Sequence, residues 1–231
     1  MNQAVRHPFN SNLHVMHIND YWGDLPILSE PQGLINEYLV SIQSVMDSAL
    51  AKHPRTLMIR FDLRYPFQQR AHCASDISRF ISSFKAQIKA DLKHKKSIGQ
   101  RVHPCNISYC WAKEQVSADL PHYHVAVFLN FDCYHTLGDY NAMSNVIDWN
   151  PHFNERVSNT ASRIIRAWAS AIQMHEWAVR GLVHFPDNAV YKISKDDADS
   201  YARAFCRLSY LAKVESKCFN DGMRWFQTSR L

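Results

Sequence analysis

The chain has few glycines and lacks the glycine-rich loops that hold nucleotide phosphates. Six of its 231 residues are glycine, and neither G-x-x-x-x-G-K-[ST] nor G-x-G-x-x-G occurs. These loops need glycine because their backbone must approach the phosphates closely. The sequence therefore argues against a nucleotide-driven motor and against an enzyme that uses a dinucleotide.

Paired cysteines and long apolar runs are also missing. The six cysteines are scattered without a C-x-x-C pair, and the N-terminus does not resemble a secretion signal. This usage is typical of reduced thiols in the cytoplasm. No apolar run approaches the ~20 residues that a membrane helix needs. We therefore expect a cytoplasmic protein that needs no disulfides and has no membrane partner.

The charge balance is modestly basic. The 26 Lys and Arg residues outnumber 21 Asp and Glu residues, which gives a formal net charge of +5. Such an excess suits a polyanion but also occurs in proteins that bind none. Because composition marks no boundary, we expect one domain over residues 35–231, preceded by an N-terminal arm over residues 1–34 that shows no sustained period.

Three segments alternate between apolar and polar residues, namely 56–65, 106–114 and 122–130. Successive side chains of a strand point to opposite faces, so each segment is predicted to form a strand with one apolar face. Residues 181–193 read as a strand or as a hairpin with its turn at 186–188.

Apolar residues recur at helical spacing in four other segments, which predicts helices at about 34–50, 75–95, 154–174 and 196–216. The basic tail at 93–96 is interpreted as a solvated helix end favoured by the helix dipole, with phosphate contact as the alternative.

These elements predict an α+β fold. Strands with one apolar face each form a mainly antiparallel, RRM-like sheet, and helices cover that face. We expect the helices to pack mainly on one face and the active site to lie on the other, uncovered face.

Two histidines emerge side by side from one end of the strand at 122–130. His122 and His124 point to the same face, and strand parity places Glu114 of the preceding strand beside them. Two imidazoles and a carboxylate can coordinate a divalent metal ion. If a bulge intervenes, Gln115 replaces Glu114. The alternative interpretation is a pair of ordinary edge-strand histidines.

A tyrosine on the last predicted helix faces away from the apolar stripe. At helical spacing Tyr210 falls among Arg203, Arg207 and Lys217, with Lys213 one turn away. These cations favour a phenolate and can hold phosphates, which would make the tyrosine a nucleophile for a phosphodiester. The alternative is a surface tyrosine whose ring covers aliphatic side-chain stems.

The order of these features resembles the HUH superfamily of single-stranded DNA nickases, in its rolling-circle Rep branch. A closer resemblance is to the inovirus gene II-like replication initiators, which include the YagK/YfjJ prophage proteins. It covers roughly residues 35–230, and the motifs that carry it are Arg60-Phe-Asp-Leu-Arg-Tyr-Pro66, Tyr109-Cys-Trp-Ala-Lys-Glu-Gln115, His122-Tyr-His-Val-Ala-Val-Phe-Leu-Asn130, Leu208-Ser-Tyr-Leu-Ala-Lys213 and Met223-Arg-Trp-Phe-Gln-Thr-Ser-Arg230.

The resemblance implies a role for each candidate residue. His122 and His124 would bind Mg²⁺ or Mn²⁺, with Glu114 as third ligand. Tyr210 would attack the strand and leave a 5′-phosphotyrosine and a free 3′-OH, while Lys213 positions the phosphate or balances the phenolate. The implied partners are single-stranded or hairpin origin DNA, a host helicase and a host polymerase.

The chain departs from the pattern of two-tyrosine relatives at one position, argues against one other enzyme class, and leaves one rival interpretation open. Two-tyrosine relatives carry a second tyrosine where this chain has Cys206, so a single nucleophile is expected. A histidine-triad hydrolase would need a third histidine where this chain has Ala126. The rival is a replication or regulatory protein that binds single strands on the same scaffold without cutting. Either protein would hold DNA through the arginines Arg60, Arg64, Arg203 and Arg207.

Overall fold

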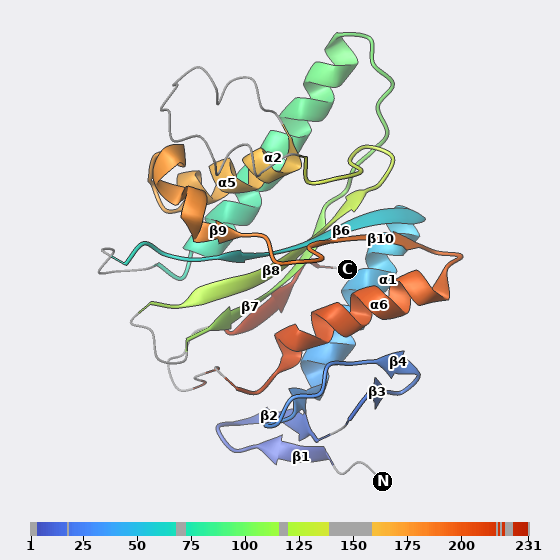
Figure 1. The fold of residues 1–231 in the computed structure, drawn as a ribbon, viewed down its shortest axis with the longest axis vertical. Helices are drawn as coiled ribbons and strands as arrows, with labels where there is room; N and C mark the ends of the chain where they lie inside the picture. The colour runs from blue at the N-terminus through green and yellow to red at the C-terminus, as the bar shows by residue number, and fades with distance from the viewer. Residues whose placement is uncertain are drawn as a thin grey trace.

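A six-stranded antiparallel sheet forms the centre of the molecule (Figure 1). The computed structural model describes residues 4–17, 19–67, 73–115, 120–138, 159–215, 217, 219 and 224–230. The strands of the sheet are β6 (Arg55–Leu63), β7 (Ser108–Glu114), β8 (His122–Asn130), β9 (Val183–His184), β10 (Val190–Ser194) and β11 (Phe226–Thr228). Their order is β10-β6-β8-β7-β11, and β9 also pairs with β6.

The three central strands pair without a change of register. Leu63 lies opposite Tyr123 on β6 and β8, and Glu114 lies opposite His122 on β7 and β8. Uninterrupted pairing keeps all residues of one parity on one face. The predicted alternation is therefore confirmed, and so is the α+β class with its antiparallel sheet.

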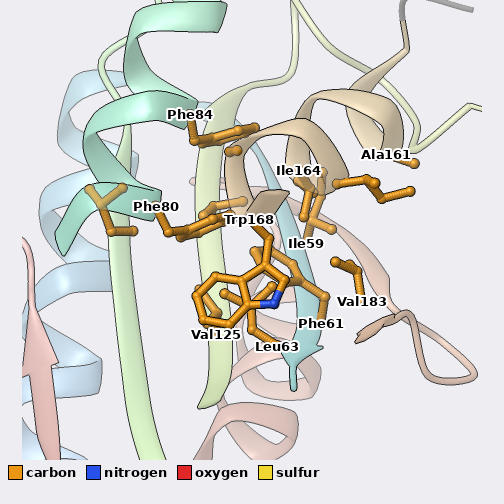
Figure 2. Close-up of a cluster of buried hydrophobic side chains, with 14 of the residues drawn as sticks. Ile59, Phe61, Leu63, Phe80, Phe84, Val125, Ala161, Ile164, Trp168 and Val183 are labelled. Atoms are coloured by element: carbon orange, nitrogen blue, oxygen red, sulfur yellow. The ribbon is translucent and has the colours of Figure 1, made fainter. Parts of the chain in front are cut away.

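One face of the sheet packs against helices α2 (Asp76–Ser97) and α5 (Thr160–Ala171). Trp168 of α5 lies in the middle of this layer, between the aromatic rings of α2 and the apolar residues of β6 (Figure 2). Asn159 caps α5 by accepting a hydrogen bond from the Ser162 backbone. The first residues of the helix predicted at 154–174, up to 158, lie outside the described residues.

The other face is covered as well, by helices α1 (Asn36–Lys52) and α6 (Ala198–Ser209) (Figure 1). The expectation that helices pack mainly on one face is therefore wrong. The physical reason is that the residues assigned to the open face are small or apolar along most of its length, and they form a second core with these helices. They include Met58, Cys110, Ala112, Ala126 and Phe128. The charged residues and histidines of β6, β7 and β8 on this face lie at one end of it, whereas Thr56 and Asn130 lie at the other end. None of the helices in the described ranges is both long and apolar enough to span a membrane.

Short strands occupy the region expected to be an extended arm. β1 (Ala4–His7), β2 (Asn10–Met16) and β5 (Leu34–Ile35) form a three-stranded sheet, and β3 (Tyr21–Trp22) pairs with β4 (Leu25–Pro26). Leu13, Val15 and Ile27 of this region are buried, and Ile27 belongs to the core that includes α1 and α6.

The segment at 181–193 forms an interrupted edge strand. His184 of β9 lies opposite Asp62, and Val190 of β10 lies opposite Ile59, so both strands pair with β6 and not with each other. Residues 185–189 form the interruption, where Asn188 has a φ of 55°. The strand alternative is thus correct and the hairpin alternative is wrong. A 3₁₀ helix, η1 (Glu176–Leu182), precedes it.

Candidate metal centre and tyrosine

Three possible metal ligands meet where β7 and β8 end, on the face that α1 and α6 cover. His122 lies directly opposite Glu114, and His124 lies opposite Ala112 two residues further along the strand. The ladder contains no bulge between these strands, so Glu114 and not Gln115 shares the face of the histidines. The parity argument is therefore confirmed at this end of the sheet.

The ligand atoms of this cluster are close enough to share one ion. Glu114 Oε2 lies 2.9 Å from His124 Nε2 and 3.5 Å from His122 Nε2. One ligand atom from each of the three residues lies within 4.8 Å of the other two. Nitrogen and oxygen donors in such a group suit a divalent first-row metal or magnesium.

Two buried atoms of the cluster lack hydrogen-bond partners. Glu114 Oε1 and His124 Nε2 are both inaccessible to solvent, and neither makes a hydrogen bond within the described part of the chain. Leaving a buried polar atom unpaired costs about 1–3 kcal/mol. A shared cation would satisfy both atoms, so the cluster fits a metal.

The Glu114 carboxyl is held in its charged form. Burial alone would raise its pKa, but contacts with His122 and His124 and the charges of His124 and Lys217 lower the pKa well below its ordinary value. A carboxylate is the form that binds a metal. The site therefore needs no deprotonation of Glu114 near neutral pH.

Asp62 orients the ring of His124 from the opposite side. Its Oδ1 lies 2.5 Å from His124 Nδ1 and 2.7 Å from Nη1 of Arg60, and its Oδ2 lies 3.3 Å from Nδ1 of His184. Burial would raise the pKa of Asp62, but His124 and Arg60 lower it, so the carboxylate only accepts hydrogen bonds. Nη2 of Arg60 also lies 2.8 Å from Nδ1 of His124, but the shorter contact with the Asp62 carboxylate favours a proton on Nδ1. Nε2 is then free to bind a metal beside Glu114.

Sequence reasoning did not assign Asp62 to the site. Its position was nevertheless informative, because it lies on the polar face of a predicted strand. What was missing was the pairing of β6 with β8, which places Asp62 opposite His124.

Tyr210 reaches the cluster from just beyond the end of α6. The helix ends at Ser209, well before the predicted limit at Ser216, which lies outside the described residues, and Tyr210 begins a 3₁₀ turn, η2 (Tyr210–Ala212). The ring of Tyr210 packs edge-on against His124 with 5.2 Å between centroids. The tyrosine is half-buried beside the histidine and does not lie on the open surface.

Lys213 connects the tyrosine to the carboxylate. Its Nζ donates a hydrogen bond to the Tyr210 hydroxyl at 2.6 Å and lies 3.1 Å from Oε2 of Glu114. Lys217, which was predicted near Tyr210, is buried and donates to the backbone carbonyl of Lys213. Burial lowers the pKa of Lys217 to about 7.

The N-terminal segment holds η2 in place. Leu34 forms a β-bridge with Lys213, and the Val214 N–H donates to the Gly33 carbonyl at 3.1 Å. Gly33 has a φ of +82°, and a Cβ there would lie 2.8 Å from the Met16 carbonyl oxygen. A side chain at this position would therefore disturb the bridge that positions Lys213.

The four arginines proposed to bind DNA differ in exposure. Arg60 is buried in its ion pair with Asp62, so its guanidinium lies beneath the site and not on the surface. Arg64 is exposed just past the end of β6, and Arg203 is exposed on α6. Arg207 is half-buried, and its Nε has no hydrogen-bond partner in the described ranges.

Comparison with known proteins places the chain in a family. The model of the YagK/YfjJ C-terminal domain matches residues 18–229. The chain is 32% identical over 209 residues to YagK of Escherichia coli (strain K12), which covers 85% of this chain and 94% of YagK. It is 28% identical over 211 residues to YfjJ of the same strain, covering 85% of this chain and 95% of YfjJ. No solved structure matches the chain. The matched region contains nearly the whole chain, including the Glu-His-His cluster and Tyr210. This chain therefore belongs to the YagK/YfjJ C-terminal domain family.

Proposed function

We propose that this protein is a metal-dependent nickase of single-stranded DNA that initiates rolling-circle replication in the bacterial cytoplasm. We place it in the HUH superfamily with the inovirus gene II-like initiators. One observation carries the proposal: a tyrosine hydroxyl bound by an ammonium group at 2.6 Å packs beside a buried Glu-His-His cluster. A nucleophile, a cation and a metal-binding group then share one site.

The metal is assigned to Glu114, His122 and His124, and Mg²⁺ or Mn²⁺ suits these donors. When bound, it would act as a Lewis acid on a non-bridging oxygen of the scissile phosphate, an effect worth several kcal/mol. Asp62 would hold His124 in the tautomer and orientation that this role requires.

Tyr210 is the proposed nucleophile. Its oxygen forms a bond to phosphorus and releases the phenol proton, while the bond from phosphorus to the 3′ oxygen breaks and that oxygen takes up a proton. The products are a 5′-phosphotyrosine and a free 3′-OH. The 3′-OH can then prime synthesis by a host polymerase.

Lys213 acts as a charge partner and not as a base. Burial would lower its pKa, but the hydrogen bond with Tyr210 and the charge of Glu114 raise it above its ordinary value. The group therefore stays an ammonium and stabilises negative charge as it develops on the tyrosine oxygen. The phenol proton must leave to another acceptor.

The exposed arginines are proposed to hold the strand. Arg64 lies just beyond β6 on the side of the cluster, and Arg203 lies on α6, which leads into Tyr210. Both offer guanidinium groups that bind phosphates. Single-stranded or hairpin origin DNA is the proposed substrate, and a host helicase would supply unwinding.

Covalent attachment tests the proposal. Purified protein is incubated with Mn²⁺ and a pool of labelled single-stranded oligonucleotides that covers the replicon encoding it, and mass spectrometry locates the nucleotide adduct. We expect the adduct on Tyr210, and we expect Tyr210→Phe to abolish it. Tyr201→Phe is the matched control, because Tyr201 lies on the same helix but its hydroxyl donates to Asp47 at 2.7 Å.

Three outcomes would contradict the proposal. Attachment that survives Tyr210→Phe would move the nucleophile to another residue. Attachment that is equal in EDTA and in Mn²⁺ would exclude the metal site. Binding of single strands without any adduct would favour the non-cleaving alternative.

A further inference from the structure

A row of lysines lies on one side of α2, away from the candidate site. Lys85, Lys89, Lys93 and Lys96 are all exposed, and they follow one another at intervals of four, four and three residues. At 3.6 residues per turn these positions fall within an arc of roughly 80° and span about 17 Å along the helix. We call this row the lysine stripe.

The lysines of the stripe have no acidic partner among the residues that the structure describes. None of its four lysines forms an ion pair with a described residue, whereas Asp91, the acid in this stretch, binds Lys95 at 2.9 Å and also pairs with Arg163. Like charges four residues apart destabilise a helix by about 0.2–0.5 kcal/mol per pair. Repulsion within the stripe therefore destabilises α2 locally, and a bound anion would offset this repulsion.

The lysine stripe lies in a strongly basic part of the sequence. Residues 85–101 contain six Lys or Arg residues and one Asp, out of 26 and 21 in the chain, which leaves 20 bases and 20 acids elsewhere. The C-terminal half of α2 and the turn that follows it therefore carry a formal charge of +5 on 17 residues. Such a local density of positive charge favours contact with a polyanion.

The lysine stripe begins beside β7. Nζ of Lys85 lies 5.1 Å from the centre of the Tyr109 ring on β7, and the charge of Arg230 acts on the same tyrosine. From Lys85 the stripe continues toward the C-terminal end of α2, which projects beyond the sheet (Figure 1). It thus forms a straight basic edge that another molecule can approach.

We infer that the lysine stripe binds the phosphate backbone of double-stranded DNA, independently of base sequence. Ammonium groups contact phosphates and read no bases. Proteins that bind single strands stack bases on aromatic side chains, but the exposed residues between the stripe lysines include the small side chains of Ala86 and Ala90. A rigid row of charges suits the regular backbone of a duplex. The inference does not depend on the cleavage chemistry.

Salt-dependent binding tests the inference. Fluorescence anisotropy measures the affinity for a labelled duplex of arbitrary sequence at several NaCl concentrations, in EDTA so that cleavage plays no part. The stripe variant is Lys89→Gln, Lys93→Gln and Lys96→Gln. The control variant makes the same change in charge at the exposed residues Lys52, Lys192 and Lys195.

Each lost phosphate contact should reduce the slope of log K against log[salt] by about 0.9. We expect the stripe variant to lose about 2–3 units of slope and the control variant to keep the wild-type slope. The stripe variant should melt no earlier than the wild type, because glutamine keeps helix propensity and removes repulsion. Equal slopes for the two variants would overturn the inference. So would a loss confined to single-stranded DNA, or one seen only with vesicles of anionic lipid.

Discussion

Oδ1 of Asp62 lies 2.5 Å from Nδ1 of His124, on the side of the ring opposite Glu114. The two residues are 62 positions apart in the sequence and meet because β6 pairs with β8. The carboxylate sets the tautomer of the imidazole and so decides which nitrogen faces Glu114. Partners of this kind commonly contribute 10-fold to 100-fold to metal affinity.

Asp62→Asn should therefore weaken Mn²⁺ binding by about 10-fold to 100-fold, because an amide accepts a weaker hydrogen bond and can present its NH₂ group to Nδ1. Isothermal titration calorimetry measures the affinity directly. Asp187→Asn is the matched control, since Asp187 is exposed in the interruption between β9 and β10. Equal affinities in the two variants would show that Asp62 does not support the ligand.

The Asp62 carboxylate should also make the free energy of unfolding depend on pH in the acidic range. The folded-state pKa of Asp62 lies below its unfolded value, so the folded protein binds fewer protons. Its contribution is fully present above the unfolded pKa of about 3.9 and is lost as the pH falls below that value toward the folded pKa. On going from pH 4 to pH 3, the wild type should lose more of its free energy of unfolding than Asp62→Asn loses. The difference between the two losses should be up to about 1.4 kcal/mol.

Urea unfolding in EDTA at several pH values measures this difference. Parallel pH profiles for the variant and the wild type would mean that the Asp62 carboxyl gains nothing from its partners in the folded state.

Lys213→Met should slow covalent attachment to DNA by about 10²-fold to 10³-fold, the range for loss of one charge-stabilising donor. Mn²⁺ binding should not weaken, because the ammonium that lies 3.1 Å from Glu114 competes with a cation. Adduct formation over time and calorimetry separate the two effects. Lys195→Met, at an exposed position, is the control. A wild-type rate of attachment in Lys213→Met would remove this lysine from the mechanism.

Trp168→Ala should destabilise the fold by about 3–5 kcal/mol. Trp168 is fully buried, and its indole N–H donates to the Arg64 carbonyl at 2.8 Å. Trp177→Ala should change stability by no more than about 0.5 kcal/mol, because 58% of Trp177 is exposed. Denaturant unfolding followed by circular dichroism compares the two. Similar losses in both variants would contradict the packing around Trp168 that Figure 2 shows.

Local periodicity predicted most elements of the fold. Helices were expected at 34–50 and 75–95 and are found at Asn36–Lys52 and Asp76–Ser97. The strand predicted at 122–130 is found with those limits. These predictions succeeded because a helical stripe or a strand alternation is carried by neighbouring residues and survives in any tertiary context.

The covering of the second face was not predictable in the same way. Ala112 and Ala126 read as members of an open face, but their small side chains let α1 and α6 approach the sheet. Likewise Tyr210 was placed by extending a helix that ends at Ser209. Leu34 and Lys213 lie far apart in the sequence, and the β-bridge between them helps to set the path of that segment.

The sequence by itself determined which side chains share a face, and so it placed Glu114, His122 and His124 together. The tertiary structure decided which strands are neighbours, and it alone brought Asp62 behind His124 and Tyr210 beside it. The physical reason is that the faces of a strand follow from backbone geometry within a few residues, whereas strand neighbours depend on the packing of the whole chain.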